Sequence, residues 1–140
     1  MTSRDLAITE FVRKMKVVSF STLRQIFFSN VSLTIAYRVL GRLTEYGELE
    51  REKHYFVNEH IFWIPKRKPK QLKHALLLSE FYRHLSVEAE VVKFDVEYSA
   101  FKGLRPDAFV AYKRKDGKSF IAFVEVELSN NKFNLKKYVD

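Results

Sequence analysis

The sequence predicts an α+β protein whose two halves differ in the periodicity of their apolar residues. In the first half, apolar residues recur at helical spacing in three short segments, and a hairpin pattern follows. In the second half, one helical segment precedes three segments in which apolar and polar residues alternate. With 46% hydrophobic and 15% aromatic residues, the 140-residue chain has enough apolar material to form a core.

Two helices are expected before residue 30. The first covers 4–15 after Thr2 or Ser3 as the N-cap, and its apolar residues are Leu6, Ile8, Phe11, Val12 and Met15. A short extended segment at 17–20 leads to a second helix capped by Ser21, whose inward residues are Leu23, Ile26 and Phe27. Ser29 and Asn30 then form a turn, so that helix, turn and helix follow one another.

The third expected helix, 33–46, is the most informative segment. Ser32 can cap its first turn and Gly47 can end it in a left-handed conformation. Ala36, Val39, Leu40 and Leu43 form one apolar stripe, which leaves Thr34, Tyr37, Arg38 and Arg42 directed elsewhere. Hydroxyl groups suit phosphate oxygens and arginine can bind a guanine edge, so Ser32 and these four residues are predicted DNA contacts. The alternative is an ordinary amphipathic helix with a solvated basic face.

A hairpin is expected directly after this helix. One arm is 49–53, and the other is either 55–57 or the more apolar 61–64. Arg51, Lys53 and His54 are placed at its tip, where they contact phosphate or the minor groove, or only keep a solvated edge soluble. Three helices followed by a hairpin are the order of a winged helix-turn-helix.

Positive charge is concentrated in the first half of the chain. Residues 1–75 contain 14 lysines and arginines against 7 acidic residues, which accounts for +7 of the net charge of +8. The segment PKRKPKQLKH carries two prolines and reads as a linker, in which Lys66, Arg67 and Lys68 either follow a DNA backbone or form a solvated spacer. The predicted domains are therefore 1–65, a linker at 66–73, and 74–140.

The second half is predicted to be a helix followed by three strands. The helix, 71–85, has a broad apolar face that suits either a domain core or a homodimer interface. The strands are expected at 91–97, 104–112 and 120–128, with a hairpin turn at Asp116 and Gly117. A last helix, capped by Ser129, is expected over 131–138.

Three carboxylates on these strands are candidate magnesium ligands. Asp107 opens the second strand, and Glu125 and Glu127 lie two apart on the third, so both point to one face. Magnesium prefers oxygen ligands, and like charges within an apolar strand need a cation or solvent. The alternative is a half-exposed sheet with a polar outer face, paired with Lys118 or Lys136.

With these residues in view, the chain resembles the replication-relaxation family of plasmid, phage and conjugative-element proteins. The resemblance rests on RVLGRLTEYGELER in the first half, and on LKHALLLSEFYRHL, RPDAFVAY, FVEVEL and KKY in the second. It implies a winged helix-turn-helix followed by a domain related to the PD-(D/E)XK nuclease fold. Glu80, Asp107 and Glu125 then match the acids of that fold.

Two departures from the nuclease pattern favour a degenerate, noncatalytic domain. Glu127 stands where an active nuclease has lysine, which leaves Lys132 or Lys136 of the following helix as a substitute. The chain also ends at Asp140, without sequence for a fourth strand. If the domain is active, the resemblance assigns catalysis to Asp107, Glu125, Glu127 and Lys136, with the metal held by Asp107 and Glu125.

The leading hypothesis is a double-stranded-DNA-binding protein of a mobile element, acting in replication, relaxation and mobilisation, or transcriptional control, with no cofactor required for binding. The alternatives are a Mg²⁺-dependent endonuclease and an adaptor for replication or mobilisation proteins. The chain has no cysteine, no apolar run of about 20 residues and no signal peptide, so a cytoplasmic protein without membrane contact is expected.

Overall fold

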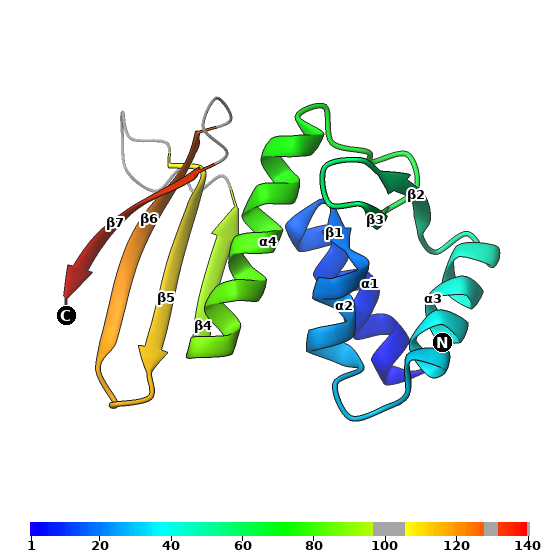
Figure 1. Cartoon of the computed structure of the whole chain (residues 1–140), viewed down its shortest axis with the longest axis horizontal. Helices are drawn as coiled ribbons and strands as arrows, with labels where there is room; N and C mark the ends of the chain where they lie inside the picture. Colours follow the sequence, from blue (N-terminus) through cyan, green and yellow to red (C-terminus); the bar gives the residue numbers. More distant parts are fainter. Residues whose placement is uncertain (97–105, 128–131, 140) are drawn as a thin grey trace. The chain divides into compact units, whose positions relative to one another are not determined.

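The computed structural model describes residues 1–96, 106–127 and 132–139 and confirms the α+β class (Figure 1). Its described residues form four helices and two antiparallel sheets, one of three strands and one of four. They divide into two compact units, Met1–Glu80 and Phe81–Asp140. The boundary falls within the fourth helix, so the basic segment at 66–73, expected to be a linker, lies inside the first unit.

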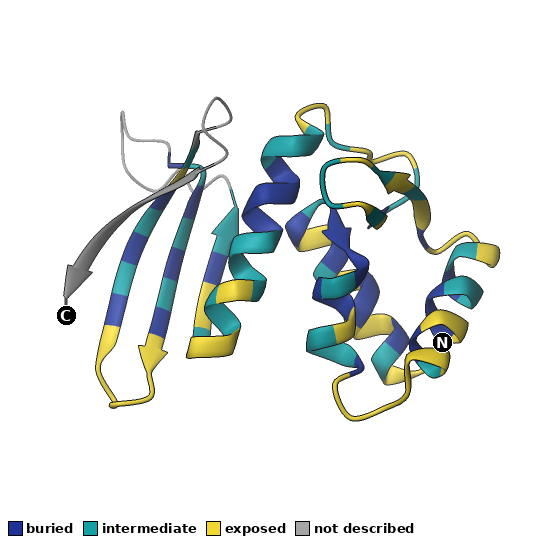
Figure 2. Ribbon diagram, viewed as in Figure 1, coloured by how far each residue is buried: buried dark blue, intermediate teal, exposed yellow. Residues whose placement is uncertain are grey.

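The first unit begins with three capped helices. They are α1 (Ser3–Met15), α2 (Phe20–Phe27) and α3 (Leu33–Glu45), with the two-residue strand β1 (Val18–Ser19) between α1 and α2. Thr2 caps α1 in a capping box with Asp5, and Ser32 caps α3 as predicted. The buried face of α3 consists of the four predicted residues Ala36, Val39, Leu40 and Leu43 (Figure 2).

The N-cap of α2 is Ser19 rather than the predicted Ser21, and Phe20 already belongs to the helix. Ser21 instead donates hydrogen bonds from its backbone N–H and its hydroxyl to the two carboxylate oxygens of Glu59, at 2.6 and 2.7 Å. A negative charge near a helix N-terminus is favourable. Glu59 therefore joins the start of α2 to the strand on which it lies, a contact that local sequence cannot reveal.

The end of α3 is fixed by Gly47, which has a φ of +79°. Its N–H donates to the carbonyl of Thr44, and the N–H of Glu48 donates to the carbonyl of Leu43. These two bonds form a Schellman motif, which satisfies carbonyls that a helix end otherwise leaves unpaired. The following residue, Leu49, is buried and leads directly into the next strand.

A hairpin of β2 (Glu50–His54) and β3 (Glu59–Trp63) completes the first sheet, whose strand order is β1-β3-β2. The second of the two predicted arms is thus the correct one. Arg51 pairs with Phe62 in the body of the hairpin and does not lie at its tip, contrary to the prediction. Trp63 is buried and donates its indole N–H to Glu50 at 2.8 Å.

The second unit consists of the end of α4 (Leu72–Glu88) and an antiparallel sheet. Its strands are β4 (Ala89–Val96), β5 (Ala108–Arg114), β6 (Ser119–Glu127) and β7 (Lys132–Val139), in that order across the sheet. Alternate residues of β5 and β6 are buried, as expected for a sheet covered on one face (Figure 2). Phe81 and Tyr82 of α4 pack on the buried ring of Phe94.

The last predicted helix, 131–138, is wrong, because residues 132–139 form β7. β7 pairs with β6 along its whole length, from Glu127 with Lys132 to Phe120 with Val139. This pairing supplies the fourth strand for which the sequence analysis found no residues. Ser129, the predicted cap, lies outside the described residues, as do Glu97, Leu104, Arg105 and Leu128 at the ends of predicted strands.

We expect substitution by alanine to change stability in opposite directions at Gly41 and Gly47, the two glycines within and just after α3. Gly47→Ala should lower the free energy of unfolding by about 1 to 2 kcal/mol, because an alanine is strained at positive φ. Gly41→Ala should raise it by about 1 kcal/mol, since Gly41 lies within α3 and an added Cβ meets no atom within 4 Å. Urea denaturation measures both, and equal effects would contradict the described end of α3.

Candidate nucleic-acid interface

The candidate interface is the exposed face of α3, opposite its buried stripe. At 100° per residue, Thr34, Arg38 and Gly41 form a row along the centre of this face. Thr34 and Arg38 are exposed, as is the cap Ser32. The row therefore presents a hydroxyl group and a guanidinium group from the first half of the helix, as the sequence predicted.

Arg42, at one flank of this row, is used within the protein. Its Nη2 atom lies 3.1 Å from the Oδ2 atom of Asp5, whose side chain is only 5% exposed. The same oxygen accepts a hydrogen bond from the backbone N–H of Thr2. The guanidinium of Arg42, a predicted DNA contact, neutralises a buried carboxylate in the first turn of α1, and the Arg42 side chain is 39% exposed.

The pKa of Asp5 reflects this arrangement. Burial raises the pKa of a carboxyl group, but here the hydrogen bonds from Thr2 and the charge of Arg42 outweigh it. The resulting pKa lies below its ordinary value, so the carboxylate form is favoured in the folded protein. The ion pair therefore joins the start of α1 to the last turn of α3.

Tyr37, at the other flank, is partly engaged as well. Its ring stacks on Phe20 of α2, with centroids 4.6 Å apart and an angle of 10° between planes. The residue is nevertheless 52% exposed, so the stacked ring still presents much of its surface to solvent. α2 thereby holds Tyr37 in one orientation beside the central row of α3.

Gly41 leaves a gap in the central row that nothing in the described structure fills. An added Cβ would meet no atom within 4 Å, so no neighbouring side chain or backbone in the described residues requires a glycine. Glycine within a helix costs about 1 kcal/mol relative to alanine. The gap allows an external partner to approach the backbone of α3 closely, a feature that the sequence analysis missed.

The β2–β3 hairpin adds further polar and aromatic groups. Arg51 and Lys53 are exposed on β2, and His54 is half-buried at its end. The tip itself is formed by residues 55–58, where Tyr55 is 82% exposed and stacks on the His54 ring at 4.7 Å. One of the two arms considered for the hairpin placed Tyr55 within a strand, and only the position of the turn reveals its exposure.

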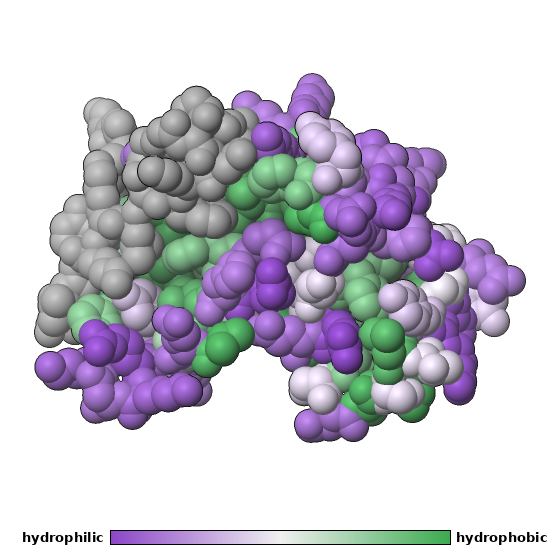
Figure 3. Space-filling model, in the orientation of Figure 1, coloured by the Kyte–Doolittle hydropathy of each residue, from purple (hydrophilic) through white to green (hydrophobic). Residues whose placement is uncertain are grey.

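The three basic residues after β3 do not share one environment. Lys68 forms an ion pair with Glu52 at 2.9 Å and lies 4.8 Å above the Trp63 ring, so it secures the segment to the hairpin. Lys66 and Arg67 are exposed. The segment is thus attached to the first unit, and its surface together with the hairpin is mostly hydrophilic (Figure 3).

The predicted magnesium ligands of the second unit are only partly brought together. The Oδ2 atom of Asp107 accepts a hydrogen bond from the backbone N–H of Val126 at 2.7 Å, and Glu125 is exposed on β6. The side chains of Glu127 and Lys136 lie outside the described residues, and Lys136 belongs to β7 instead of a helix. Among described side chains, no three His, Asp or Glu residues are grouped to hold a metal ion.

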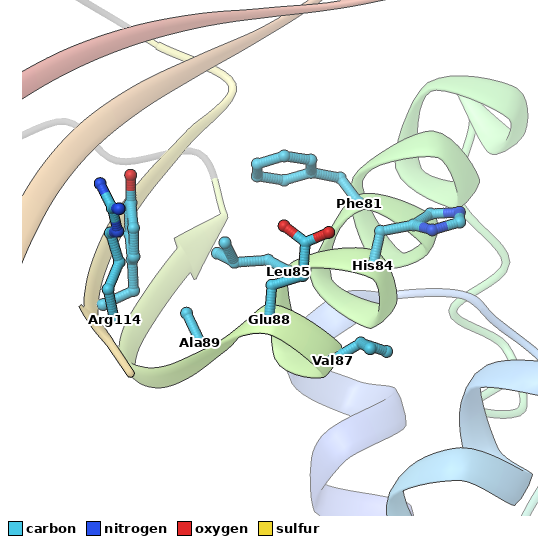
Figure 4. Close-up of a pocket in the computed structure, with 8 residues that line it drawn as sticks. Phe81, His84, Leu85, Val87, Glu88, Ala89 and Arg114 are labelled. Atoms are coloured by element: carbon cyan, nitrogen blue, oxygen red, sulfur yellow. The ribbon is translucent and has the colours of Figure 1, made fainter. Parts of the chain in front are cut away.

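A separate cavity of about 510 Å³ lies at the end of α4 in the second unit (Figure 4). Phe81, Leu85 and Tyr112 give it an apolar lining. Polar groups come from His84 and Glu88 on the helix and from Arg114 on β5, which also forms an ion pair with Asp116 at 3.4 Å. This cavity could not be predicted from the sequence, because its lining combines one helix end with a strand that lies far from it along the chain.

Comparison with protein-family models, curated proteins and solved structures finds no match for this chain. The resemblance to the replication-relaxation family therefore stays a prediction from the motifs. Within the described ranges, no helix has both the length and the hydrophobicity needed to cross a bilayer.

We expect Asp5→Asn to lower the free energy of unfolding at pH 7 by about 1 to 2 kcal/mol, because it removes the negative charge beside the partly exposed Arg42. A carboxyl group whose pKa is depressed on folding stabilises the protein above its unfolded pKa of about 3.9, and loses that effect as pH falls through the folded value. The difference from wild type should therefore shrink below about pH 4.

Denaturation at several pH values measures this difference. Glu10→Gln, at an exposed position of the same helix, is the matched control and should change the free energy by less than about 0.5 kcal/mol. A difference between Asp5→Asn and wild type that stays constant down to pH 2 would contradict the assigned role of the carboxylate.

Proposed function

We propose that the first unit is a winged helix-turn-helix domain that binds double-stranded DNA through α3. The single observation that carries the proposal is the outer face of α3, where Thr34 and Arg38 are exposed in a row with the gap at Gly41. A helix of this kind can enter the major groove, where arginine pairs with guanine and hydroxyl groups bind phosphate. The buried stripe and both caps hold that face outward.

The neighbouring elements support the same proposal. The hairpin follows α3 after a short turn and presents Arg51, Lys53 and Tyr55, as the wing of such a domain does. The net charge of +7 over residues 1–75 favours association with a polyanion. Arg42 and Lys68 are not part of the proposed surface, because both neutralise carboxylates of this unit.

The wider role rests on the motif resemblance. We propose that DNA binding serves replication, mobilisation or transcriptional control of a mobile element. The endonuclease alternative requires Asp107 as a metal ligand; its Oδ2 atom accepts the Val126 N–H bond, and the carboxylate has a second oxygen that can bind a cation. Denaturing gels of protein–DNA mixtures with Mg²⁺ test cleavage directly.

Arg38→Gln should weaken binding to a preferred duplex about tenfold, because it removes the guanidinium that can reach a base edge or phosphate. Fluorescence anisotropy across a salt series measures the affinity, using a duplex selected from a random pool and a scrambled one. Lys115→Gln removes one exposed charge from the second unit and is the matched control. Equal affinities of the Arg38→Gln variant and wild type would refute the proposed reading face.

Substitution of Gly41 should separate binding from stability. Gly41→Ala and Gly41→Leu place increasingly large side chains in the central row of α3, where no described atom of the protein stands in the way. We expect duplex affinity to fall in that order while the fold is retained, because the added atoms prevent close approach of the DNA. The same anisotropy titration measures the duplex affinity of both variants, and thermal unfolding checks that they are folded. Unchanged duplex affinity of the Gly41→Leu variant would contradict a close approach of DNA to the backbone of α3.

A further inference from the structure

A second cavity, of about 280 Å³, lies in the first unit and is lined by three cationic side chains. Arg13 and Lys16 come from the end of α1, Arg67 comes from the segment after β3, and Ile64 and Pro69 complete the lining. None of these five residues is acidic. Cations gathered around one cavity repel one another, so an anion inside it stabilises the arrangement.

The fold brings these cations together from distant parts of the chain. β1 pairs antiparallel with β3, with Val18 opposite Phe62, and the same register carries Lys16 towards Ile64. Arg67 is positioned by a turn in which its backbone N–H donates to the carbonyl of Ile64 at 2.9 Å. Within the described part of the chain, no ion pair involves Arg13 or Arg67.

Lys16, which lines this cavity, and Lys66, which precedes Arg67 in the sequence, have a backbone conformation that favours glycine. Lys16 caps α1 with φ +76° and ψ −45°, and Lys66 has φ +68°. Lys66 is the third residue of a turn that has Pro65 in second place, a position where glycine is normally found. Strained residues gather at ligand-binding sites, where the strain is part of the arrangement. The positive φ of Lys16 holds the end of α1 so that residue 16 lines the cavity beside Arg13.

We infer that this cavity binds a phosphate group. Two guanidinium groups can each hold a pair of phosphate oxygens, and an ammonium adds a compact positive charge. The volume is near the lower limit of about 300 Å³ for ligand pockets, so it suits a phosphate group whose attached atoms extend into solvent. The phosphate belongs either to a small phosphorylated molecule or to a nucleic-acid backbone.

The test is a two-dimensional NMR titration of the whole chain with sodium phosphate, against sodium chloride at matched ionic strength. We expect saturable shifts at residues 13–16 and 64–69 in the millimolar range. Arg67→Gln and Lys16→Gly should each weaken phosphate binding about tenfold. Lys16→Gly should not lower Tm, because glycine accepts the positive φ. Lys70→Gln, which removes an exposed charge of the same segment outside the lining, is the matched control.

Duplex titrations of the same variants distinguish the two sources. Reduced duplex affinity in Arg67→Gln and Lys16→Gly, with competition by phosphate, assigns the site to the DNA backbone. Unchanged duplex affinity together with lost phosphate binding assigns it to a small phosphorylated molecule. Chemical-shift changes that do not saturate with phosphate, or that are equal in all variants, would overturn the inference. Arg38→Gln should bind phosphate as wild type does, so failure of the α3 proposal is separable from failure of this one.

Discussion

The ion pair between the buried carboxylate of Asp5 and the guanidinium of Arg42 is the interaction on which the arrangement of the first unit depends. The carboxylate completes the capping box that begins α1, and it accepts the guanidinium of Arg42 from the last turn of α3. A buried charge without a partner is costly, so α3 is favoured in the rotation that brings Arg42 to Asp5. The buried stripe of Ala36, Val39, Leu40 and Leu43 favours the same rotation, and together they determine which side chains of α3 face outward.

The outer face of α3 follows from this constraint. Arg42 on one flank and Tyr37 on the other are held by α1 and α2, while Thr34 and Arg38 between them remain exposed. The Schellman motif at Gly47 then turns the chain into β2, so that the hairpin follows the same helix. Charged residues therefore divide into those that hold the fold together, such as Arg42 and Lys68, and those available to a partner, such as Arg38.

Elements with strong local patterns could be predicted from the sequence, because periodicity and caps are local properties. The buried stripe of α3, its cap Ser32 and the turn at Gly117 are examples. Long-range contacts could not be predicted: Arg42 pairs with a carboxylate 37 positions away, and Ser21 binds Glu59 instead of capping α2. A helix was predicted over 131–138, but residues 132–139 form a strand because the edge of β6 offers backbone partners along its length.

The most direct test of the account is amide hydrogen exchange of the whole chain with and without a bound duplex. We expect slower exchange in α3 and in the β2–β3 hairpin when DNA is present, with no change in β5 and β6 of the second unit. Protection confined to the second unit, or no protection in α3 at saturating DNA, would contradict the assignment of α3 as the DNA-binding element.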